Sequence, residues 1–364
     1  MVTTSGPAGD PGIERSLLSA CRRAFPTLTD LRIDDLTRIS DGWECEVYSF
    51  VLTGAESGEP RRSDLILRVY PDAGGEAKAG GEHDVVRRLH RAGFAVPAML
   101  ALGREDGPVG RPFVVMERIV GPVLGSRLSA ATDGRREELL DRFCRLLAGL
   151  HALDWRPHVA EPGRYSADGH VARWVDWADG MLRRFGRSEF DPAVAWLRRR
   201  AADVRCERLS VTHGDYHCWN VLLRERDDAL FVIDWTQAGI SDYRFDLGWT
   251  LVLMRTNFGR EMRDATLAGY ERASGRAVPD PDFFEAAAAL RRAASIAIAL
   301  TAGPESLGMR PEAAGKMRDQ AGHLATALAV LRETTGVTLP DAVALIEIVG
   351  DANAPGHERS SEHR

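Results

Sequence analysis

Apolar and polar residues alternate with a period of two along much of the first 120 residues, as in strands that are buried on one face. The alternation runs through residues 39–70, with a turn-rich stretch at residues 53–63. A further short strand is expected at residues 113–116. Between these strands, residues 82–89 have helical spacing, and Gly93 follows as a stop signal. We therefore predict a sheet with one prominent helix.

Beyond residue 120, apolar residues recur at every third or fourth position, which predicts helices. One helix begins near Asp133, a residue type that favours helix N-termini, and continues to Leu150. One strand pair, residues 221–223 and 230–233, interrupts the helical pattern. Further helices are expected at residues 171–184, 192–204, 247–256, 282–300 and 311–334.

These two patterns predict an α+β fold of two unequal lobes. The first is a small antiparallel-sheet lobe with one main helix, residues 13–118, and the second is a larger helical lobe, residues 119–350. Residues 1–12 and 351–364 are mostly small or polar and have no apolar periodicity, so disordered ends are expected.

The composition narrows the class of protein. With 44% hydrophobic and 27% charged residues, the 364-residue chain is typical of a soluble globular protein. Its net charge of −6 argues against nucleic-acid binding, which needs a concentrated basic surface. No uncharged run approaches the roughly 20 residues of a membrane-spanning helix, and the N-terminus lacks the features of a signal peptide. Five cysteines, scattered singly, fit a reducing cytoplasm.

Arginine supplies almost all of the basic charge. Of the 47 basic residues only Lys78 and Lys316 are lysines, so chemistry that requires lysine has two candidates. The phosphate-binding motif GxxxxGK[ST] is absent, as are GxGxxG and GxSxG. These absences argue against the P-loop, dinucleotide-binding and serine-hydrolase classes.

The most informative segment is LSVTHGDYHCWNVLLRERDDALFVIDW, residues 209–235. Asp215 follows an apolar strand in a short loop, Asn220 directly precedes the next strand, and Asp234 ends the strand after that. A hairpin of the last two strands would bring Asn220 and Asp234 together, with Asp215 beside them. Asp and Asn oxygens suit Mg²⁺, and a third carboxylate can act as a base. Phosphoryl transfer needs this set of groups.

Two other interpretations of this segment exist. Taken singly, an Asp at a strand end or an Asn before a strand is a turn former. Alternatively, His213, Asp215 and His217 could bind a transition metal in a metal-dependent hydrolase. That site would need further ligands, but the other histidines form no second cluster, and Gly214 stands where a zinc-protease helix carries its catalytic Glu. For His213 we favour a structural role, as a buried imidazole that braces the loop.

Residues 213–220, followed by IDW at residues 233–235, resemble the aminoglycoside phosphotransferase-like family, whose members share the protein-kinase-like fold. The resemblance covers about residues 39–300. It implies that Asp215 is the catalytic base and that Asn220 and Asp234 hold Mg²⁺ against the phosphates of ATP. It also implies that Asp246, within the sequence RFDLG, braces the catalytic loop.

The kinase-like fold implies further residues in the first lobe. A flexible turn over the phosphates is expected at Gly42. Arg68, the only charge in the apolar strand of residues 65–70, is expected to contact phosphate, with Glu82 at the start of the following helix as its partner. Protein kinases use lysine at this position, and the nearby Lys78 lies in a Gly-rich linker. Alternatively, Arg68 is one more solvated arginine of an arginine-rich chain.

The connector between the lobes is expected to bind adenine through backbone groups near Glu117 and Ile119. Met116 would wall the adenine pocket, or it is an ordinary core residue. In the second lobe, Trp174 and Trp177 could stack on an acceptor or simply pack within the fold.

The sequence and the resemblance together predict an ATP- and Mg²⁺-dependent phosphotransferase. It would move the γ-phosphate of ATP to a hydroxyl of a small molecule, such as an antibiotic, a sugar, an amino alcohol or a related metabolite. Polycationic aminoglycosides would favour an acidic cleft, but residues 282–300 contain few acids, so no acceptor is identified. The alternative is a catalytically silent, kinase-fold nucleotide-binding protein, for which only the departure at Arg68 argues. We expect no nucleic-acid or membrane partner.

Overall fold

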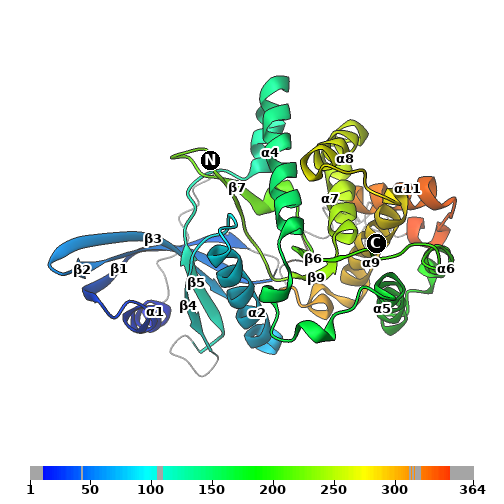
Figure 1. Cartoon of the computed structure of the whole chain (residues 1–364). Helices are drawn as coiled ribbons and strands as arrows, with labels where there is room; N and C mark the ends of the chain where they lie inside the picture. The colour runs from blue at the N-terminus through cyan, green and yellow to red at the C-terminus, as the bar shows by residue number, and fades with distance from the viewer. Residues whose placement is uncertain are drawn as a thin grey trace, which may run out of the picture.

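The computed structural model describes residues 11–41, 44–104, 110–310, 313, 315 and 321–344. Within these residues, a five-stranded antiparallel sheet forms the N-terminal part and a larger, mainly helical part follows it (Figure 1). The α+β class that the two hydrophobic patterns predict is therefore confirmed.

The sheet has the strand order β1-β2-β3-β5-β4, and each neighbouring pair is antiparallel. Its strands are β1 (Leu28–Asp41), β2 (Glu46–Glu56), β3 (Glu59–Val69), β4 (Met99–Gly103) and β5 (Phe113–Glu117). Two helices accompany the sheet, α1 (Pro11–Ala24) and α2 (Asp72–Arg91).

Alternate residues of β3 pack on opposite faces of the sheet. Leu65 and Leu67 belong to the apolar cluster on the face that α1 covers. Ile66 packs on the other face, against a smaller cluster that includes Ala79 of α2. Because Arg68 follows Ile66 by two positions, its side chain also lies on the α2 face.

Two boundaries in this part differ from the prediction. β2 and β3 form one long hairpin whose turn is only Ser57 and Gly58, both with positive φ, so most of residues 53–63 lies in strands. α2 begins at Asp72 and not at Glu82, so the predicted Gly-rich linker is helical and contains Lys78. Glycine weakens a helix by roughly 1 kcal/mol relative to alanine, but tertiary packing overrides that preference here.

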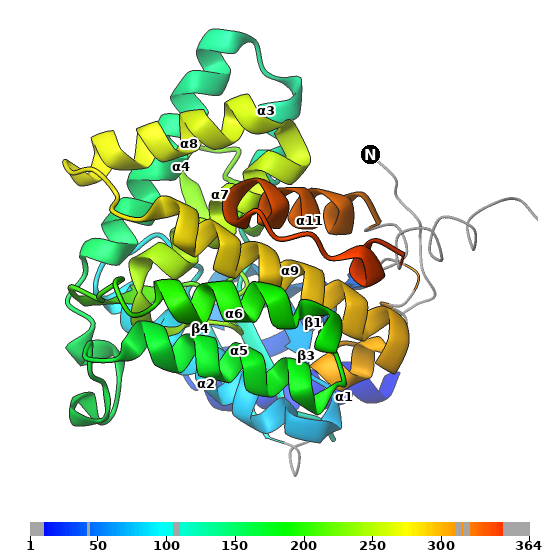
Figure 2. The same ribbon diagram turned by 90° about the vertical axis from the view of Figure 1, so that its right-hand side faces the viewer.

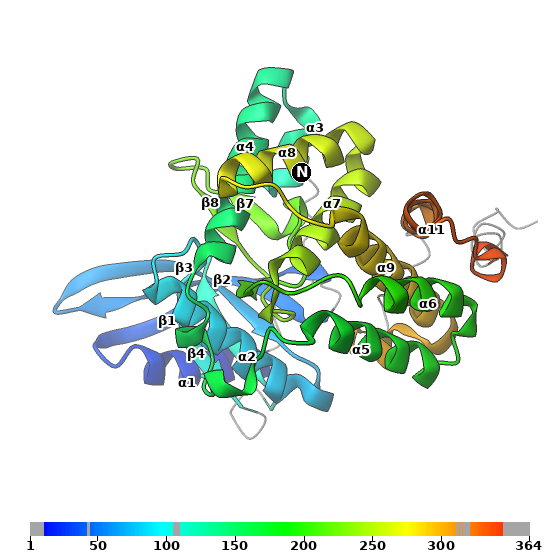
Figure 3. The same cartoon turned by 45° about the vertical axis from the view of Figure 1, so that its right-hand side comes forward.

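The second part is built from helices and two short strand pairs. Its helices are α3 (Leu124–Ala130), α4 (Asp133–Ala152), α5 (His170–Arg184), α6 (Asp191–Arg200), α7 (Tyr243–Phe258), α8 (Arg260–Ser274), α9 (Pro281–Ala302) and α11 (Ala321–Thr335). The strand pairs are β6 (Leu209–Thr212) with β9 (Gly239–Asp242) and β7 (Val221–Leu223) with β8 (Leu230–Val232). α5 lies beside α6, and α9 lies between α6 and α7 (Figures 2 and 3).

The end of β5 lies close to the predicted boundary between the lobes. β5 ends at Glu117, two residues before residue 119, where the second lobe is expected to start. The disorder expected for residues 1–12 and 351–364 falls almost entirely outside the described residues, but α1 already begins at Pro11. In the part of the chain that the structure describes, no helix is both long and apolar enough to cross a membrane.

Candidate active site

The loop between β6 and β7 begins with the HGD sequence and ends with Asn220. Gly214 has a φ of +78°, and a Cβ atom at this position would lie 2.3 Å from the carbonyl oxygen of Gln237. Only glycine fits such a close approach. The chain therefore turns sharply directly before Asp215.

His213 is fully buried under this loop, and both of its ring nitrogens are used within the protein. Nε2 donates to the carbonyl oxygen of Ile233 across 3.0 Å, and Nδ1 accepts from the amide of Asp215 across 3.2 Å. Burial lowers the pKa of His213, which favours the neutral ring that these two bonds require. His213 thus braces the loop. Among the described residues, no group of three or more His, Cys, Asp or Glu side chains could hold a metal ion.

Asp246 holds the same loop from α7. Its Oδ2 accepts from the amide of His213 across 2.7 Å, and its Oδ1 accepts from the amide of Gly214 across 2.9 Å. His151 Nε2 lies 3.2 Å from Oδ2. Burial alone would raise the pKa of Asp246, but His151 and the loop outweigh it and hold this pKa below its usual value.

Asp215 has a hydrogen-bond donor at each carboxylate oxygen. Trp249 Nε1 donates to Oδ1 across 2.7 Å, and Asn220 Nδ2 donates to Oδ2 across 3.2 Å. Burial alone would raise the pKa of Asp215, but the ring of His217, 3.5 Å away, and the guanidinium of Arg291 hold it well below its usual value. With 31% of the side chain exposed, this carboxylate is ionised and open to a ligand.

The β7–β8 hairpin brings Asn220 and Asp234 to the same end, as its sequence pattern predicts. The amide of Ile233 donates to the carbonyl oxygen of Asn220 across 2.9 Å. Asp234 follows with a φ of +65°, a left-handed conformation that turns the chain away from β8. The side-chain amide of Asn220 also donates to the carbonyl oxygen of Asp215 across 3.0 Å. Asp215, Asn220 and Asp234 are therefore neighbours.

Arg68 reaches this cluster from β3. Its Nη2 donates to Asp234 Oδ1 across 3.0 Å, its Nη1 to Glu82 Oε1 across 2.6 Å, and its Nε to Cys45 Sγ across 3.2 Å. Only 9% of the side chain is exposed, so Arg68 is not a solvated surface arginine. Burial would raise the pKa of Asp234, but the Arg68 guanidinium holds it below its usual value.

Glu82 lies within α2, and not at the start of a helix as predicted. It is 2% exposed, and besides Arg68 it accepts hydrogen bonds from the amide of Trp235, at 3.2 Å, and from the hydroxyl of Tyr70. Burial raises the pKa of Glu82, against the opposing charge of Arg68. Glu82 thus links α2 and β3 to the segment after β8.

Two oxygen atoms of the cluster accept no hydrogen bond from a described residue, Asn220 Oδ1 and Asp234 Oδ2. The Asp234 side chain is 41% exposed, so its oxygen is accessible. Mg²⁺ prefers such oxygens, and it needs only one or two protein side chains when phosphates and water complete its coordination. These two residues therefore fit a magnesium ion.

The connector after β5 leaves the backbone amide of Ile119 without a hydrogen-bond acceptor among the described residues. The amide of Glu117 donates to the carbonyl oxygen of Ala98 across 2.9 Å, whereas the amide of Ile119 has no partner among the described residues. Met116 is 6% exposed and packs in the apolar cluster on the α2 face of the sheet. Its side chain therefore contributes to the packing on that face of the sheet.

Of the two other candidates from the first lobe, only Lys78 lies within the described residues, and it does not join the cluster. Gly42 lies outside the described residues. Lys78 Nζ donates to Glu44 Oε2 across 2.8 Å and to the carbonyl oxygen of Gly308 across 3.1 Å. Arg68, and not Lys78, is therefore the basic residue of β3 and α2 that contacts Asp234.

The two tryptophans of α5 differ in their surroundings. Trp174 stacks on Phe245, with 4.6 Å between ring centroids, and packs against the apolar core. Trp177 is 54% exposed. Packing within the fold therefore accounts for Trp174, whereas Trp177 is open to solvent.

Trp249 and Arg291 belong to the site, although no motif marks them. Arg291 of α9 donates from Nη1 to the carbonyl oxygen of Gly214 across 2.8 Å, and its Cζ lies 4.2 Å from the centroid of the Trp249 ring. One signal was available in the sequence, because Arg291 and Arg292 are the only charged residues in the mostly apolar run of residues 286–300. For Trp249, which lies in the almost continuously buried helix α7, the sequence offers no such signal.

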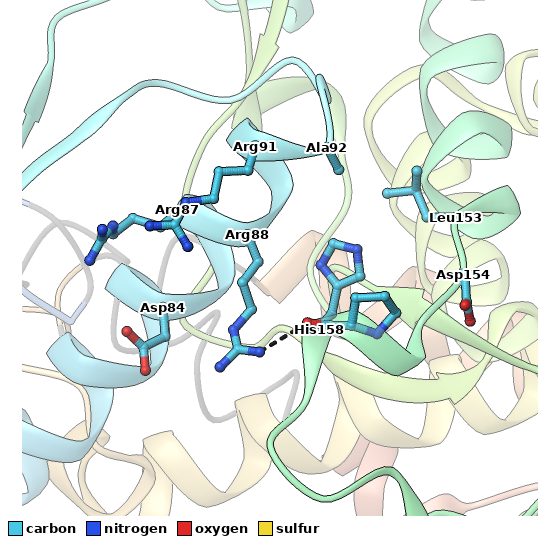
Figure 4. Close-up of a pocket in the computed structure, with 9 residues that line it drawn as sticks. Asp84, Arg87, Arg88, Arg91, Ala92, Leu153, Asp154 and His158 are labelled. Atoms are coloured by element: carbon cyan, nitrogen blue, oxygen red, sulfur yellow. Dashed lines mark hydrogen bonds between the residues drawn. The ribbon is translucent and has the colours of Figure 1, made fainter.

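A separate cavity of about 630 Å³ opens between α2 and the segment that follows α4 (Figure 4). Arg87, Arg88 and Arg91 line it from α2, together with Asp154 and His158. None of the residues gathered around Asp215 and Asp234 lines this cavity, so it is not part of the cluster.

Comparison with known proteins gives a family match over most of the chain. A model of the phosphotransferase enzyme family matches residues 35–289. Acyl-CoA dehydrogenase family member 10 from Mus musculus is 24% identical over 174 residues, which cover 46% of this chain. The match spans only 16% of that protein's length.

Solved structures share the fold at low sequence identity. A candidate aminoglycoside phosphotransferase from Ralstonia eutropha is 18% identical, with a TM-score of 0.59 over 85% of this chain and 97% of that one. An aminoglycoside phosphotransferase, APH(2″)-IIIa, solved with GDP and kanamycin, is 15% identical, with a TM-score of 0.57 over 92% and 98%. A choline/ethanolamine kinase family protein from Mesorhizobium loti is 16% identical, with a TM-score of 0.51 over 86% and 92%. The two-lobed, protein-kinase-like fold is therefore confirmed.

Proposed function

The chain belongs to the phosphotransferase enzyme family, and on this basis we propose that it transfers the γ-phosphate of ATP, with Mg²⁺, to a hydroxyl group of a small molecule. One observation supports this function most strongly. Arg68 of the sheet hydrogen-bonds to Asp234 of the helical part, while Asn220 hydrogen-bonds to Asp215. A phosphate-binding cation, two metal-binding oxygens and a base are thus side by side.

In this proposal Asp215 is the catalytic base. The acceptor oxygen forms a bond to the γ-phosphorus, the bond from that phosphorus to the β-phosphate oxygen breaks, ADP leaves, and the hydroxyl proton passes to Asp215. Trp249 and Asn220 orient the carboxylate through their hydrogen bonds. The depressed pKa makes Asp215 a weak base, which suffices because a loose phosphoryl-transfer transition state needs orientation of the nucleophile more than its deprotonation.

The other site residues act on the nucleotide. Asn220 and Asp234 would hold Mg²⁺, which neutralises phosphate charge when it is bound. Arg68 contacts phosphate, and Glu82 fixes its position. His213 and Asp246 keep the loop in place.

The nucleotide lies, in this proposal, between lobes of residues 13–118 and 119–350. Adenine binds along Met116, Glu117 and Ile119, with the amide of Ile119 as the donor, and the turn at Gly42 covers the phosphates.

The silent-protein alternative depended on arginine at position 68. Because Arg68 is held by Glu82 and contacts Asp234, its presence does not favour loss of catalysis. All five cysteines are free, which supports a reducing compartment.

The function is tested by incubating the purified protein with ATP, Mg²⁺ and a panel of hydroxylated metabolites and antibiotics, and by measuring ADP release. We expect ADP release that depends on an acceptor and is abolished in Asp215→Ala. ATP binding without turnover on any acceptor would support the silent alternative. Stoichiometric zinc without ATP binding would contradict both.

A further inference from the structure

Arg291 of α9 lies beside the proposed base. Its guanidinium donates to the carbonyl oxygen of Gly214, the residue before Asp215, and stacks on the ring of Trp249. Trp249 in turn donates to Asp215 Oδ1. The cation is therefore adjacent to the position where the acceptor hydroxyl would meet Asp215.

Arg291 has more hydrogen-bonding capacity than its contacts within the protein use. A guanidinium group carries five N–H donors, and the described residues provide one acceptor, the carbonyl oxygen of Gly214, for Nη1. No carboxylate of a described residue forms an ion pair with Arg291. The side chain is partly exposed, and none of its nitrogen atoms is both buried and without a partner. The remaining donors are therefore accessible to a ligand.

Arg291 has one further arginine and two carboxylates in its surroundings. The neighbouring Arg292 contacts His323 Nδ1 across 3.0 Å. The carboxylates whose charges act on Arg291 are Asp215 and Asp246. Both already accept hydrogen bonds from other groups, Asp215 from Trp249 and Asn220 and Asp246 from two loop amides.

We propose that Arg291 binds an oxyanion of the acceptor, a carboxylate or a phosphate group, while the acceptor's hydroxyl faces Asp215. A largely buried cation is costly without an anionic partner, and a guanidinium pairs with an oxyanion through two parallel N–H bonds. A polycationic acceptor would instead meet the like charge of Arg291. This acceptor class rests on the proposed phosphotransferase function.

The oxyanion takes no part in the bond changes. The hydroxyl oxygen of the same molecule bonds to the γ-phosphorus of ATP, ADP leaves, and the hydroxyl proton passes to Asp215. Arg291 is thus a specificity residue, because it sets where the hydroxyl lies relative to Asp215.

The experiment compares matched acceptors that differ in charge. ADP release is measured with glycerate, glycerol 3-phosphate, glycerol, glyceramide, choline and kanamycin, in the presence of ATP and Mg²⁺. We expect kcat/KM for the oxyanionic members to exceed that of glycerol and glyceramide by about 10- to 100-fold, as a charged hydrogen-bonded pair gives. Glycerate and glycerol 3-phosphate distinguish a carboxylate from a phosphate as the preferred group.

Substitutions of Arg291 test whether this side chain binds the oxyanion of the acceptor. Arg291→Ala should raise KM for the oxyanionic acceptor by about 10- to 100-fold, whereas kcat/KM for the matched neutral acceptor should fall much less. Arg291→Lys, which keeps the charge, should recover part of the discrimination. Arg199→Ala, at an exposed position on α6, is the control for loss of an arginine and should match the wild type. Melting temperatures establish that each variant is folded.

The results distinguish failure of the oxyanion site at Arg291 from failure of the proposed phosphotransferase function. Turnover that favours choline, kanamycin or glycerol would overturn the oxyanion site and leave the phosphotransferase function intact. If Arg291→Ala lowered kcat/KM equally for charged and neutral acceptors, Arg291 would be a structural residue, and this result would also overturn the oxyanion site. Absence of turnover on every acceptor would count against both.

Discussion

Arg68 Nη2 lies 3.0 Å from Asp234 Oδ1, although 166 positions separate the two residues in the chain. Arg68 comes from β3 of the sheet, and Asp234 follows β8 of the helical part. The same guanidinium is held from the other side by Glu82 of α2. Both parts of the molecule therefore contribute residues to the proposed phosphate site. The position of α2 affects this site because Glu82 holds Arg68.

Arg68→Lys should not be a conservative change. One ammonium group cannot reach Glu82, Asp234 and Cys45 at once, as the guanidinium does. We expect the affinity for Mg²⁺-ATP to fall by about tenfold, the loss of one charged hydrogen bond. Titration calorimetry with ATP and Mg²⁺ measures this.

Lys78→Ala is the matched control for Arg68→Lys, because it removes the other basic residue that sequence alone could assign to phosphate. Lys78 contacts Glu44 and Gly308 and not Asp234. Its removal should leave nucleotide affinity close to the wild-type value. A larger loss of Mg²⁺-ATP affinity in Lys78→Ala than in Arg68→Lys would assign the phosphate contact to Lys78.

Trp249→Phe should weaken turnover without weakening nucleotide binding. The change removes the donor to Asp215 Oδ1 and keeps an aromatic ring under Arg291. Because that hydrogen bond favours the ionised carboxylate, its loss raises the pKa of Asp215. We expect kcat to fall by about tenfold and the acid limb of the kcat/KM profile to move to higher pH.

Trp177→Phe is the control for this change, since Trp177 is the exposed tryptophan of α5. It should leave kcat and the pH profile unchanged. If Trp249→Phe also kept the wild-type pH profile, Trp249 would not act through Asp215.

Local pattern was sufficient to predict the β7–β8 hairpin and the loop before it, because short strands with a polar turn between them determine which side chains meet. The contact between Arg68 and Glu82 was predicted from the resemblance to the kinase-like fold, and local pattern contributed only the observation that Arg68 is the one charge in an apolar strand. The start of α2 was wrong because the glycines before Lys78 disfavour a helix that packing against the sheet stabilises. Trp249 and Arg291 were missed because only tertiary structure brings α7 and α9 to the loop.

Asp246→Asn should destabilise the fold in a pH-dependent way. The pKa of Asp246 is lower in the folded protein than its ordinary value, so the carboxylate contributes stability above about pH 4, the value expected in the unfolded chain. That contribution is lost as the pH falls through the folded pKa. We expect a deficit of about 2 kcal/mol at pH 7, which shrinks below pH 4, in urea unfolding.

Asp203→Asn, at an exposed position after α6, provides the control for an Asp-to-Asn change and should alter stability little at any pH. A deficit in Asp246→Asn that stays constant from pH 7 to pH 3 would show that charge on this carboxyl does not brace the loop.

Asp234→Ala should remove the effect of Mg²⁺ on ATP binding. Asp234 Oδ2 is one of the two oxygens that fit the ion, and Asn220 Oδ1 alone would hold it weakly. In the wild type we expect Mg²⁺ to strengthen ATP binding, and in the variant we expect similar affinities with and without Mg²⁺. A full Mg²⁺ effect in Asp234→Ala would assign the ion to other residues.

The central claim, that Asp215 orients and deprotonates an acceptor hydroxyl for phosphoryl transfer, is tested most directly with ATP labelled at its γ-phosphate. Wild type and Asp215→Asn are compared on the best acceptor, with label counted on the acceptor and Mg²⁺-ATP affinity measured in parallel. The claim predicts transfer of label by the wild type, a loss of about 100-fold or more in Asp215→Asn, and ATP binding close to wild type in the variant. Transfer by Asp215→Asn at the wild-type rate, or label released only to water by the wild type, would contradict it.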